Sequence, residues 1–457
     1  MTRIRKLLIA NRGEIASRII ATARRLDIAT VAIYSDSDAD APYVKEADEA
    51  VALIGNAPSE TYLRSDLIVA AALRTNCQAI HPGYGFLSEN APFADACAAA
   101  GLIFVGPPPE AIAAMGSKII AKDLMKAAGV PILAGITISD GEEIGADLTA
   151  RAEVEVGFPL LVKAAYGGGG RGMRAVDHPG ELLGAIASAR REAASAFGNG
   201  TVFLEHYVQS PRHIEVQIFA DTHGNAVHLF ERECSIQRRY QKIIEEAPSV
   251  AIDEELRAEL GSAALKAARA IGYVGAGTVE FVMGSDRRFF FLEVNTRLQV
   301  EHPVTESVTG LDLVNTQIRL AAGEKMPFDQ ARASEIHFHS IEHRINAEDP
   351  EHNFAPSPGK ISEVVLPGGC GVRLDTHLYA GYTVPSFYDS LIAKLIVFAS
   401  DRGNAVKRSL RALSELETSG IKTTRDFHKK VLSHPDFLSG DFDTSFVEKY
   451  FLPNSGH

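Results

Sequence analysis

Apolar and polar positions in the first hundred residues follow two different periods. Four short apolar runs are typical of buried strands, at residues 6–10, 28–34, 79–80 and 103–105. The first run is followed by apolar residues at the spacing of an amphipathic helix, namely Ile15, Ile19, Ala23 and Leu26. Alternating strands and helices predict a parallel, doubly wound sheet, which binds ligands at the carboxyl ends of its strands. We therefore expect a ligand beside the turns at 11–14 and 81–85.

The rest of the chain changes pattern after the three prolines at 107–109. A helix with Lys118 near its start comes next. Three further regions follow: a small α+β module at 132–208, strands around one long helix at 209–327, and short strands, turns and a late helix beyond 327. The length of 457 residues fits roughly three domains.

A run of glycines, at 167–170 and 172, lies between two apolar segments that have the pattern of strands. Because a strand and not a helix follows, the run is neither a Walker P-loop nor a Rossmann fingerprint. It is either a flexible surface hairpin or a mobile lid whose N–H groups bind phosphates. Four successive glycines are costly to order, which favours the lid. Lys163, at the end of the preceding strand, is placed to reach a phosphate.

A predicted hairpin, with strands at 277–283 and 289–295, carries the most informative acidic residues. A loop at 285–288 places Glu280 opposite Glu293. Two like charges that face each other across a ladder are destabilising unless a cation lies between them. Carboxylate oxygens and the amide of Asn295 suit Mg²⁺ or Mn²⁺. The alternative is an edge strand with an ordinary solvated face.

The second strand of this hairpin also predicts a continuous functional face. If the chain stays extended, alternate residues point one way: Phe289, Phe291, Glu293, Asn295, Arg297, Gln299 and Glu301. This face begins aromatic and becomes polar, as expected for a strand that leaves a core and enters a cleft.

Composition and charge exclude several classes of function. The formal net charge of -12 argues against a nucleic-acid partner but is compatible with small anionic substrates. Four cysteines without metal-ligand spacing indicate reduced thiols, with Cys234 a small buried residue. We find no secretion signal and no apolar run long enough to span a membrane, so we expect a cytoplasmic protein. The charged runs at 231–233 and 237–239 are expected to be solvated strand surface.

Several long motifs resemble those of the biotin carboxylase family over nearly the whole chain. They lie at residues 9–16, 81–90, 167–173, 293–306, 344–350 and 356–360. A lone glycine run would be weak, but long motifs in this order are very specific. The resemblance implies mixed α/β and α+β architecture: a Rossmann-like domain over 1–115, an ATP-grasp domain over 116–328 with a lid at about 132–208, and a β-rich C-terminal domain over 329–457.

The resemblance also implies the binding residues for ATP and metal. Phosphates would be held by Lys118, Lys163, Gly169 and Gly170. Adenine would be read, largely by backbone, at Glu205, His206, Tyr207 and Val208. Further nucleotide contacts would come from His213 and, in place of a histidine, Tyr240. The ligands of Mg²⁺ or Mn²⁺ would be Glu280, Glu293 and Asn295, in agreement with the hairpin.

By the same resemblance, bicarbonate would be bound by Lys242, Arg297, Gln299 and the Val300 backbone. Glu301 would be the general base, because bicarbonate is a poor nucleophile until it loses its proton. Tyr84 and Arg344 would lie beside biotin, with Arg344 stabilising the enolate-like oxygen of its ureido group. Arg297 and Arg344 would act together with Lys242 and Glu301 in catalysis through carboxyphosphate.

The resemblance implies partner proteins as well. The chain has no Met-Lys-Met biotinylation site, since Ala127 follows Met125 and Lys126. Little sequence remains after residue 450 for another domain. We therefore expect biotin on a separate biotin carboxyl carrier protein, separate carboxyltransferase subunits, and a homodimer.

Three departures from the family pattern, Tyr240, Tyr166 and Cys370, suggest a carboxylase system other than ordinary fatty-acid synthesis. Tyr240 cannot supply the positive charge of the histidine it replaces, and Cys370 stands where an aromatic residue is expected at the dimer contact. Two other functions remain open: an ATP-grasp ligase that joins a carboxylate to an amine, and a catalytically inert nucleotide-binding regulator. An intact set of lysines, metal ligands and base favours carboxylation.

Overall fold

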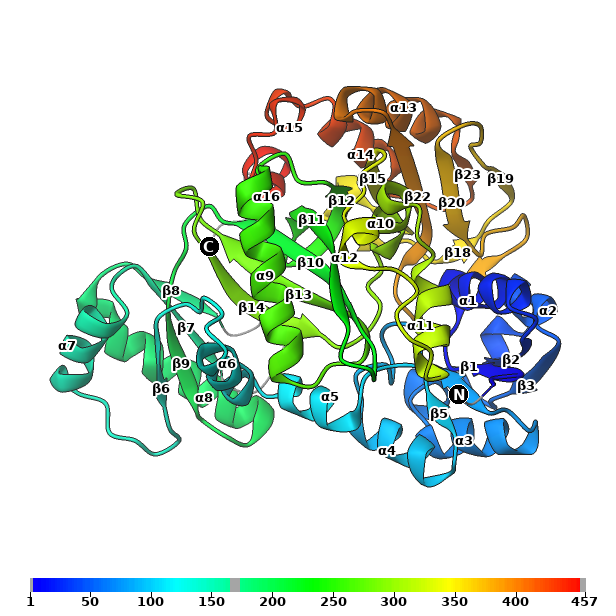
Figure 1. Ribbon diagram of the computed structural model, residues 1–457. Coiled ribbons are helices and arrows are strands. Elements are labelled where there is room, and N and C mark those ends of the chain that lie inside the picture. Colours follow the sequence, from blue (N-terminus) through cyan, green and yellow to red (C-terminus); the bar gives the residue numbers. More distant parts are fainter. Residues whose placement is uncertain (1–2, 165–172, 453–457) are drawn as a thin grey trace.

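The computed structural model describes residues 3–164 and 173–452 (Figure 1). Three predicted positions, Tyr166, Gly169 and Gly170, lie outside the described residues. The N-terminal unit, blue to cyan in Figure 1, contains a five-stranded sheet of order β3-β2-β1-β4-β5 in which every pair is parallel. Its strands are β1 (Lys6–Ile9), β2 (Ala29–Tyr34), β3 (Glu49–Ala52), β4 (Ala79–His81) and β5 (Ile103–Phe104). The predicted doubly wound sheet is confirmed.

Helices connect these strands, and the two predicted ligand turns meet at one edge of the sheet. The main helices are α1 (Gly13–Arg25), α3 (Ser65–Arg74) and α4 (Ala91–Ala99). β1 and β4 are neighbours, so the turns that follow them are adjacent. Asn11 Nδ2 donates to the carbonyl oxygens of Pro82 and Tyr84, each at 2.7 Å. These two bonds fix the position of the Tyr84 turn relative to the start of α1.

The α+β module folds around its own sheet, of order β6-β9-β7-β8. The strands are β6 (Gly135–Ile138), β7 (Leu160–Ala164), β8 (Arg174–Val176) and β9 (Val202–His206). Helices α7 (Ala146–Glu155) and α8 (Leu182–Phe197) complete the module, and α6 (Lys118–Ala127) leads into it. β7 pairs with β8 in antiparallel fashion, so the glycine run joins two strands, as predicted.

An eight-stranded sheet, order β14-β13-β10-β11-β12-β15-β22-β20, forms the centre of the molecule. All its pairs are antiparallel. The strands are β10 (Arg212–Ala220), β11 (Ala226–Arg238), β12 (Gln241–Ala247), β13 (Gly275–Met283), β14 (Phe289–Asn295), β15 (His339–Asn346), β20 (Val372–Thr376) and β22 (Leu391–Ala399). The sheet passes without a break across the predicted boundary at 328/329, which remains a prediction.

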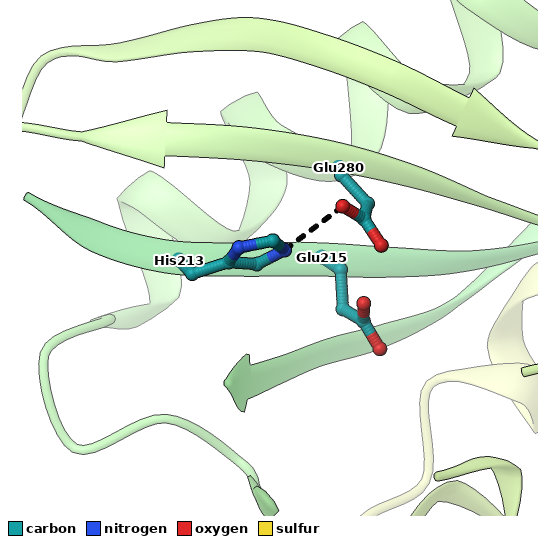
Figure 2. Close-up of side chains that lie close together, drawn as sticks. All are labelled: His213, Glu215 and Glu280. Atoms are coloured by element: carbon teal, nitrogen blue, oxygen red, sulfur yellow. Dashed lines mark ion pairs between the residues drawn. The ribbon is translucent and has the colours of Figure 1, made fainter. Parts of the chain in front are cut away.

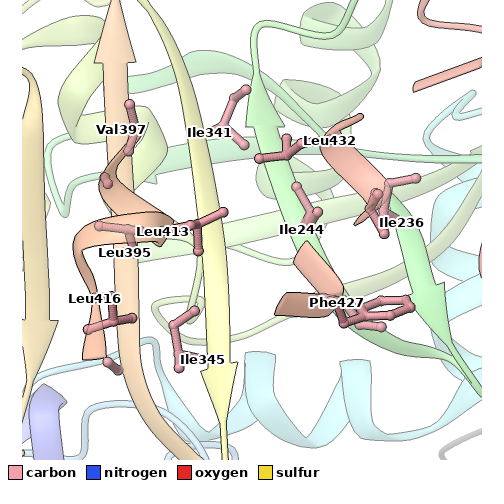
Figure 3. Packing of buried hydrophobic residues seen from close by; sticks show 14 of the residues in the cluster. Ile236, Ile244, Ile341, Ile345, Leu395, Val397, Leu413, Leu416, Phe427 and Leu432 are labelled. Carbon is pink, nitrogen blue, oxygen red and sulfur yellow. The ribbon is translucent and has the colours of Figure 1, made fainter. Parts of the chain in front are cut away.

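Alternation along these strands separates the hydrophobic core from the polar face. In β15, Ile341 and Ile345 pack with Leu395 of β22 beneath α13 (Arg402–Glu415) and α14 (Arg425–Leu432) (Figure 3). Successive side chains of a strand point to opposite faces. Arg344 and Lys394 therefore project to the other face, where α10 (His302–Thr309) packs.

The long helix α9 (Glu254–Ala270) covers the other half of the sheet. Ile214 of β10 and Val279 of β13 belong to the apolar cluster that α9 completes with Leu256 and Leu260. Polar residues at the intervening positions of β10 and β13 are thereby turned towards the cleft. Among the described residues, no helix is long and apolar enough to cross a membrane.

Candidate active site

The β13–β14 hairpin brings the two predicted metal-binding acids together. Glu280 and Glu293 are direct partners in the ladder, and Thr278 is the partner of Asn295. The predicted pair Glu280–Glu293 is confirmed, but the register nearer the loop differs from the one that a loop at 285–288 implies, because Met283 and not Gly284 pairs with Phe289. Glu280 is buried, whereas Glu293 is open to solvent. The pair thus presents one fixed and one accessible carboxylate.

The continuous face predicted along β14 is wrong, because the strand contains a bulge. Glu280 pairs with Glu293, but the next residue, Phe281, pairs with Phe291, so Leu292 is an extra residue. An extra residue reverses the alternation of side chains beyond it. Phe291 therefore packs in the α9 core together with Phe281, while Glu293 faces the cleft. The apolar pattern of β14 carries no sign of this insertion.

The chain also ceases to be extended after Asn295, so Arg297, Gln299 and Glu301 do not continue a strand. They converge through side-chain contacts instead. Arg297 donates to the oxygens of Asn295 at 2.9 Å and Gln299 at 2.7 Å, and Gln299 Nε2 donates to Glu280 Oε1 at 2.9 Å. The irregular segment at 296–301 therefore bends the predicted bicarbonate residues back onto the metal-binding hairpin.

Lys242 lies at the centre of the site. Its Nζ donates to Glu215 at 2.6 Å, Glu280 at 2.9 Å and Glu301 at 2.7 Å. An ammonium has three donors, so these contacts use all of them. Burial alone would lower the pKa of Lys242, but the three carboxylates raise it well above its usual value. Lys242 therefore stays cationic and joins the predicted metal ligand Glu280 to the predicted base Glu301.

The carboxylates around Lys242 include one group that resembles a metal site. His213, Glu215 and Glu280 have ligand atoms within 4.8 Å of one another, and His213 Nε2 lies 3.0 Å from Glu280 Oε2 (Figure 2). Lys242 already neutralises two of these acids, and Arg232 donates to Glu215 from the other side. Two protein cations occupy the place of an ion, so this group is better described as an ion-pair network.

The hairpin acids, in contrast, fit a divalent cation. Glu293 makes no hydrogen bond or ion pair within the described residues, and partial loss of hydration together with the charge of Glu280 raises its pKa. An acid held in this way is stabilised by a nearby cation. Two carboxylates and the Asn295 oxygen are hard ligands of the kind that Mg²⁺ and Mn²⁺ prefer. The predicted ligand set is thus chemically suitable.

Replacing Glu280 with glutamine is expected to raise the Mg²⁺ concentration needed for half-maximal rate by at least about tenfold. Even mutation of the hydrogen-bond partners of a metal ligand typically lowers metal affinity by about 10- to 100-fold, and loss of the ligand itself should cost no less. The rate is measured against Mg²⁺ at saturating ATP. Glu259→Gln, on the exposed side of α9, is the matched control and should leave the curve unchanged. A titration of the Glu280 variant that overlays the wild-type curve would contradict the assignment.

The predicted base, Glu301, is buried between cations. Arg344 donates to Glu301 Oε2 at 2.9 Å and to Glu245 Oε1 at 2.6 Å, while Lys242 binds the other oxygen of Glu301. Burial would raise the pKa of Glu301, but Lys242 and Arg344 lower it well below its usual value. Glu301 is therefore ionised and ready to accept a proton once a bound anion competes for these cations.

The neighbouring Glu245 behaves in the opposite way. Burial, reinforced by the charge of Glu301, raises the pKa of Glu245 from 4.5 to about 7, despite the attraction of Arg344. Between these values the folded protein retains a proton that the unfolded chain has lost. Glu245 therefore makes stability fall as the pH rises through this window.

Glu245→Gln mimics the protonated acid and should lack this pH dependence. We expect the variant to gain stability relative to wild type between about pH 5 and about pH 8. Urea unfolding of both proteins at the two pH values measures the difference. If the difference in unfolding free energy between the variant and wild type were the same at both pH values, or became less favourable to the variant at the higher pH, Glu245 would be ionised throughout this range.

The predicted ATP residues lie between α6, β7 and β9. Lys163 and Lys122 both form ion pairs with Glu205, and burial opposed by these lysines leaves the pKa of Glu205 below its usual value. Lys118 is the first residue of α6, where the positive end of the helix dipole favours an anion. Desolvation and the charge of Lys163 lower the pKa of Lys118. These cations form a region suited to phosphate.

The proposed adenine segment continues β9. His206 N donates to Ala134 O and Tyr207 N donates to Pro159 O, each at 3.0 Å, so these two amides are engaged by the module itself. Val208 is half-buried, close to the β13–β14 loop. Tyr240 is 62 % exposed at the tip of the β11–β12 turn. Tyr240 is thus a surface residue and is not part of the buried network.

The two predicted biotin residues approach the site from different units. Tyr84, in the turn after β4, donates its hydroxyl hydrogen to Glu14 at the start of α1. Arg344 projects from β15. The ring of Tyr84 lies 5.6 Å from the Nζ of Lys394, which is fully buried on β22. The N-terminal unit therefore supplies one wall of the site and the central sheet supplies the other.

The run at 231–233 is buried, which corrects the expectation of a solvated surface, and so are Gln237 and Arg238. Arg232 is 0 % exposed and donates to Glu215, Gln217, Thr278 and Thr305. A buried charge must be paired, and here long-range partners provide the pairing. Cys234 is buried and all four cysteines are free, as expected.

Sequence reasoning missed several members of this network: Glu14, Glu89, Glu215, Arg232, Glu245 and Lys394. Glu215 had a visible signal, since His213, Glu215 and Gln217 alternate with buried apolar residues along β10. Glu89 lies within the motif at 81–90 and accepts from Arg297 Nε at 2.7 Å. Glu14 lies in the predicted ligand turn at 11–14, whereas Arg232, Glu245 and Lys394 depend on contacts between distant segments and had no local signal.

Three sequence families match consecutive parts of the chain. Biotin carboxylase, N-terminal domain, matches residues 3–112, and the ATP binding domain of the carbamoyl-phosphate synthase L chain matches residues 117–328. Biotin carboxylase C-terminal domain matches residues 342–449. Biotin carboxylase 1 of Bacillus subtilis (strain 168) is 50% identical over 99% of this chain and 100% of its own length. The chain belongs to the biotin carboxylase family.

Other relatives serve different carboxylases. A pyruvate carboxylase subunit from Methanothermobacter thermautotrophicus is 51% identical over 97% of this chain and 90% of its own length. The biotin carboxylase domain dimer of Hydrogenobacter thermophilus 2-oxoglutarate carboxylase, solved with MgADP, ADP and bicarbonate, has a TM-score of 0.92 and 46% identity, with 98% of each chain covered. The fold and the order of domains are therefore those of a biotin carboxylase, an ATP-grasp ligase.

Proposed function

We propose that the chain carboxylates biotin through the network centred on Lys242, as one component of a larger carboxylase. The observation that carries this proposal is the contact of a single ammonium with Glu280 and Glu301 at 2.9 and 2.7 Å. The first acid belongs to the candidate metal and phosphate side of the cleft, and the second is the candidate base. Phosphoryl transfer and proton removal from bicarbonate can therefore occur at one point.

Bicarbonate would bind between Lys242 and Arg297, with Gln299 and the backbone of Val300 completing its pocket. In the structure, Lys242 and Arg297 are each paired with carboxylates, and bicarbonate would share the two cations with these carboxylates. Its negative charge would weaken the hold of Lys242 on Glu301 and raise the pKa of this acid. Glu301 would then accept the proton of bicarbonate while the resulting oxygen attacks the γ-phosphorus of ATP and ADP departs.

The triphosphate would lie against Lys118, Lys163 and the glycines at 169 and 170, with adenine along 205–208 and further contacts from His213 and Tyr240. The exposed Glu293, together with Glu280 and Asn295, would hold Mg²⁺ or Mn²⁺, which supplies charge neutralisation when bound. Phosphoryl transfer depends mainly on such positioning and neutralisation. The lysines that surround Glu205 support this placement.

Carboxyphosphate would break down to CO₂ and phosphate, and the phosphate would remove the ureido proton of biotin. The oxygen of the deprotonated ureido group needs a fixed cation nearby. Arg344 is held between Glu245 and Glu301, at 2.6 and 2.9 Å, which keeps its guanidinium in one orientation. Tyr84 would bound the biotin pocket from the N-terminal unit.

The proposed partners are a biotin carboxyl carrier protein and carboxyltransferase subunits, in a cytoplasmic assembly built on a homodimer. The division into domains at 1–115, 116–328 and 329–457 is part of the same proposal.

The experiment that tests this function is ADP release measured with and without bicarbonate and free biotin. We expect release to require bicarbonate and to increase with biotin, together with incorporation of labelled bicarbonate into biotin. A ligase that joins a carboxylate to an amine would ignore biotin, and an inert regulator would release no ADP. Either of those results would refute the proposal.

A further inference from the structure

Lys394 is a fully buried lysine whose contacts join the two halves of the site. Its Nζ donates to the carbonyl oxygen of Val300 at 3.0 Å and lies 3.0 Å from Glu14 Oε1. The Tyr84 ring is 5.6 Å away on the same side. Val300 belongs to the candidate bicarbonate pocket, and Tyr84, through Glu14, to the candidate biotin wall. One ammonium therefore touches structures from both subsites.

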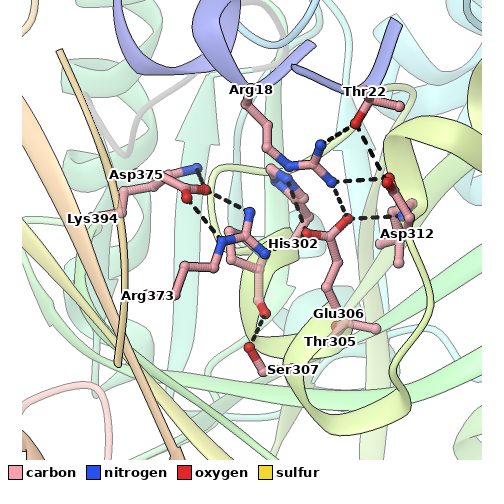
Figure 4. Close-up of polar contacts among 12 residues, drawn as sticks. Arg18, Thr22, His302, Thr305, Glu306, Ser307, Asp312, Arg373, Asp375 and Lys394 are labelled. Carbon is pink, nitrogen blue, oxygen red and sulfur yellow. Dashed lines mark hydrogen bonds and ion pairs between the residues drawn. The ribbon is translucent and has the colours of Figure 1, made fainter. Parts of the chain in front are cut away.

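The ladder explains why Lys394 points in this direction. Lys394 is the direct partner of Arg344 on β15 and of Asp375 on β20. Like charges directly opposite each other are unfavourable, and Arg344 is drawn towards Glu245 and away from Lys394. Asp375 is held by two hydrogen bonds from Arg373, at 2.8 and 2.7 Å, and stays 3.9 Å from Nζ (Figure 4).

Arg373 also pairs with Glu306, so that negative and positive side chains alternate from Asp375 to Arg18 and hold Asp375 in place. Glu306 accepts from Arg373 at 2.6 Å and from Arg18 of α1 at 2.7 Å (Figure 4). These pairs leave Glu14 as the close carboxylate partner of Lys394 within the described residues. The ammonium is thus directed at the interface between the N-terminal unit and the central sheet.

The contact with Val300 has a consequence for the base. Val300 precedes Glu301, so a hydrogen bond to its carbonyl fixes the peptide plane that leads into the catalytic carboxylate. Lys242 and Arg344 hold the carboxylate itself. Backbone and side chain of this segment are therefore anchored by different cations, and the backbone anchor, Lys394, also reaches Glu14.

We propose that Lys394 is a positioning residue for biotin carboxylation. It holds the bicarbonate pocket at Val300 in a fixed position relative to the biotin wall at Tyr84 and Glu14. This inference rests on the proposed function. Lys394 touches no reacting atom in this proposal. It acts through the Val300 peptide on one side and through the Glu14 carboxylate on the other.

The test is the kinetics of Lys394→Met, a substitution of similar length that removes the donor and the charge. We expect kcat/KM for bicarbonate and for free biotin to fall by about 10- to 100-fold, the range that a hydrogen bond to a charged group provides. The KM for ATP should stay within about twofold, because Lys394 is remote from the phosphate lysines. Lys45→Met, at an exposed position on α2 (Pro42–Glu46), is the matched control and should behave as wild type.

Removal of Lys394 leaves Glu14 buried without its cation, which can destabilise the fold. The double variant Glu14→Gln/Lys394→Met removes both charges and provides a folded protein for the same assays. We expect it to unfold near the wild-type temperature and to remain as slow as the single variant. Lys394→Arg should recover part of the lost rate, because a guanidinium retains both charge and donors.

Full activity in the double variant would show that Lys394 only neutralises Glu14, and would overturn the proposal. So would wild-type kcat/KM for bicarbonate and biotin in Lys394→Met, or an equal loss for ATP in a folded protein. These outcomes are separate from failure of the proposed function, in which the wild-type chain itself would not carboxylate biotin.

Discussion

Glu301→Gln is expected to slow biotin carboxylation by about 10²- to 10⁴-fold, the usual contribution of a general base. Glutamine has nearly the same shape but only one acceptor oxygen, so it keeps the hydrogen bond from Lys242 or from Arg344, and it cannot take up a proton. ATP affinity should be unchanged, because Glu301 contacts the bicarbonate side of Lys242 and none of the phosphate lysines. Initial rates and nucleotide binding, measured on the same preparation, separate the two effects.

Glu335→Gln, at an exposed position before β15, is the matched control for this substitution. It should carboxylate biotin at the wild-type rate. If the Glu301 variant retained near-normal carboxylation, Glu301 would be a structural partner of Lys242 and another group would have to remove the proton. If the Glu301 variant lost ATP affinity as well, Glu301 would contribute to the nucleotide site in addition to the bicarbonate site.

Arg344→Met is expected to reduce carboxylation by about 10²- to 10³-fold, comparable to the loss of a preorganised donor to an oxyanion. The guanidinium bridges Glu245 and Glu301, and its removal leaves two buried acids close together. The double variant Arg344→Met/Glu245→Gln avoids this charge imbalance and should be equally slow. Arg344→Lys retains the charge but not the two-sided geometry, so only partial activity is expected.

Measured rates with free biotin, combined with thermal unfolding, test this assignment. A slow Arg344 variant whose partner variant Arg344→Met/Glu245→Gln regained the wild-type rate would mean that Arg344 only balances charge. We expect instead that the loss persists in both variants, while bicarbonate-dependent use of ATP is less affected.

Much of the fold could be predicted from local patterns. The parallel N-terminal sheet follows from strands and helices that alternate with short turns, and the pairing of β13 with β14 follows from the short connection between them. In both cases the residues that decide the structure are neighbours in the sequence. The pair Glu280–Glu293 was predicted, but it depends on the bulge at Leu292, because Met283 pairs with Phe289 and the ladder shifts by one residue beyond Phe281.

The bulge at Leu292 and the buried run at 231–233 could not be predicted in this way. A bulge adds one residue without changing composition, and its effect on the faces of β14 depends on the partner strand. Arg232 looks like a surface residue until Glu215, Gln217 and Thr305 surround it. Buried charge requires partners from distant segments, which a single sequence does not display.

The network around Lys242 illustrates the same limit within the site. The resemblance to biotin carboxylases identified Lys242, Glu280 and Glu301 as separate binding residues for different ligands. The structure joins them through one ammonium and adds Glu215 as a third carboxylate. The departures at Tyr240 and Cys370 both lie at exposed positions, so they alter surfaces and leave the buried network intact.

The most direct measurement is a crystal structure of the chain with ADP, Mg²⁺ and bicarbonate. The prediction is density for a metal ion coordinated by Glu280 and Glu293, and for a flat anion within hydrogen-bonding distance of Lys242, Arg297 and the Val300 backbone. An ion bound elsewhere, with these two acids turned apart and Lys242 still enclosed by its three carboxylates in the presence of bicarbonate, would contradict it.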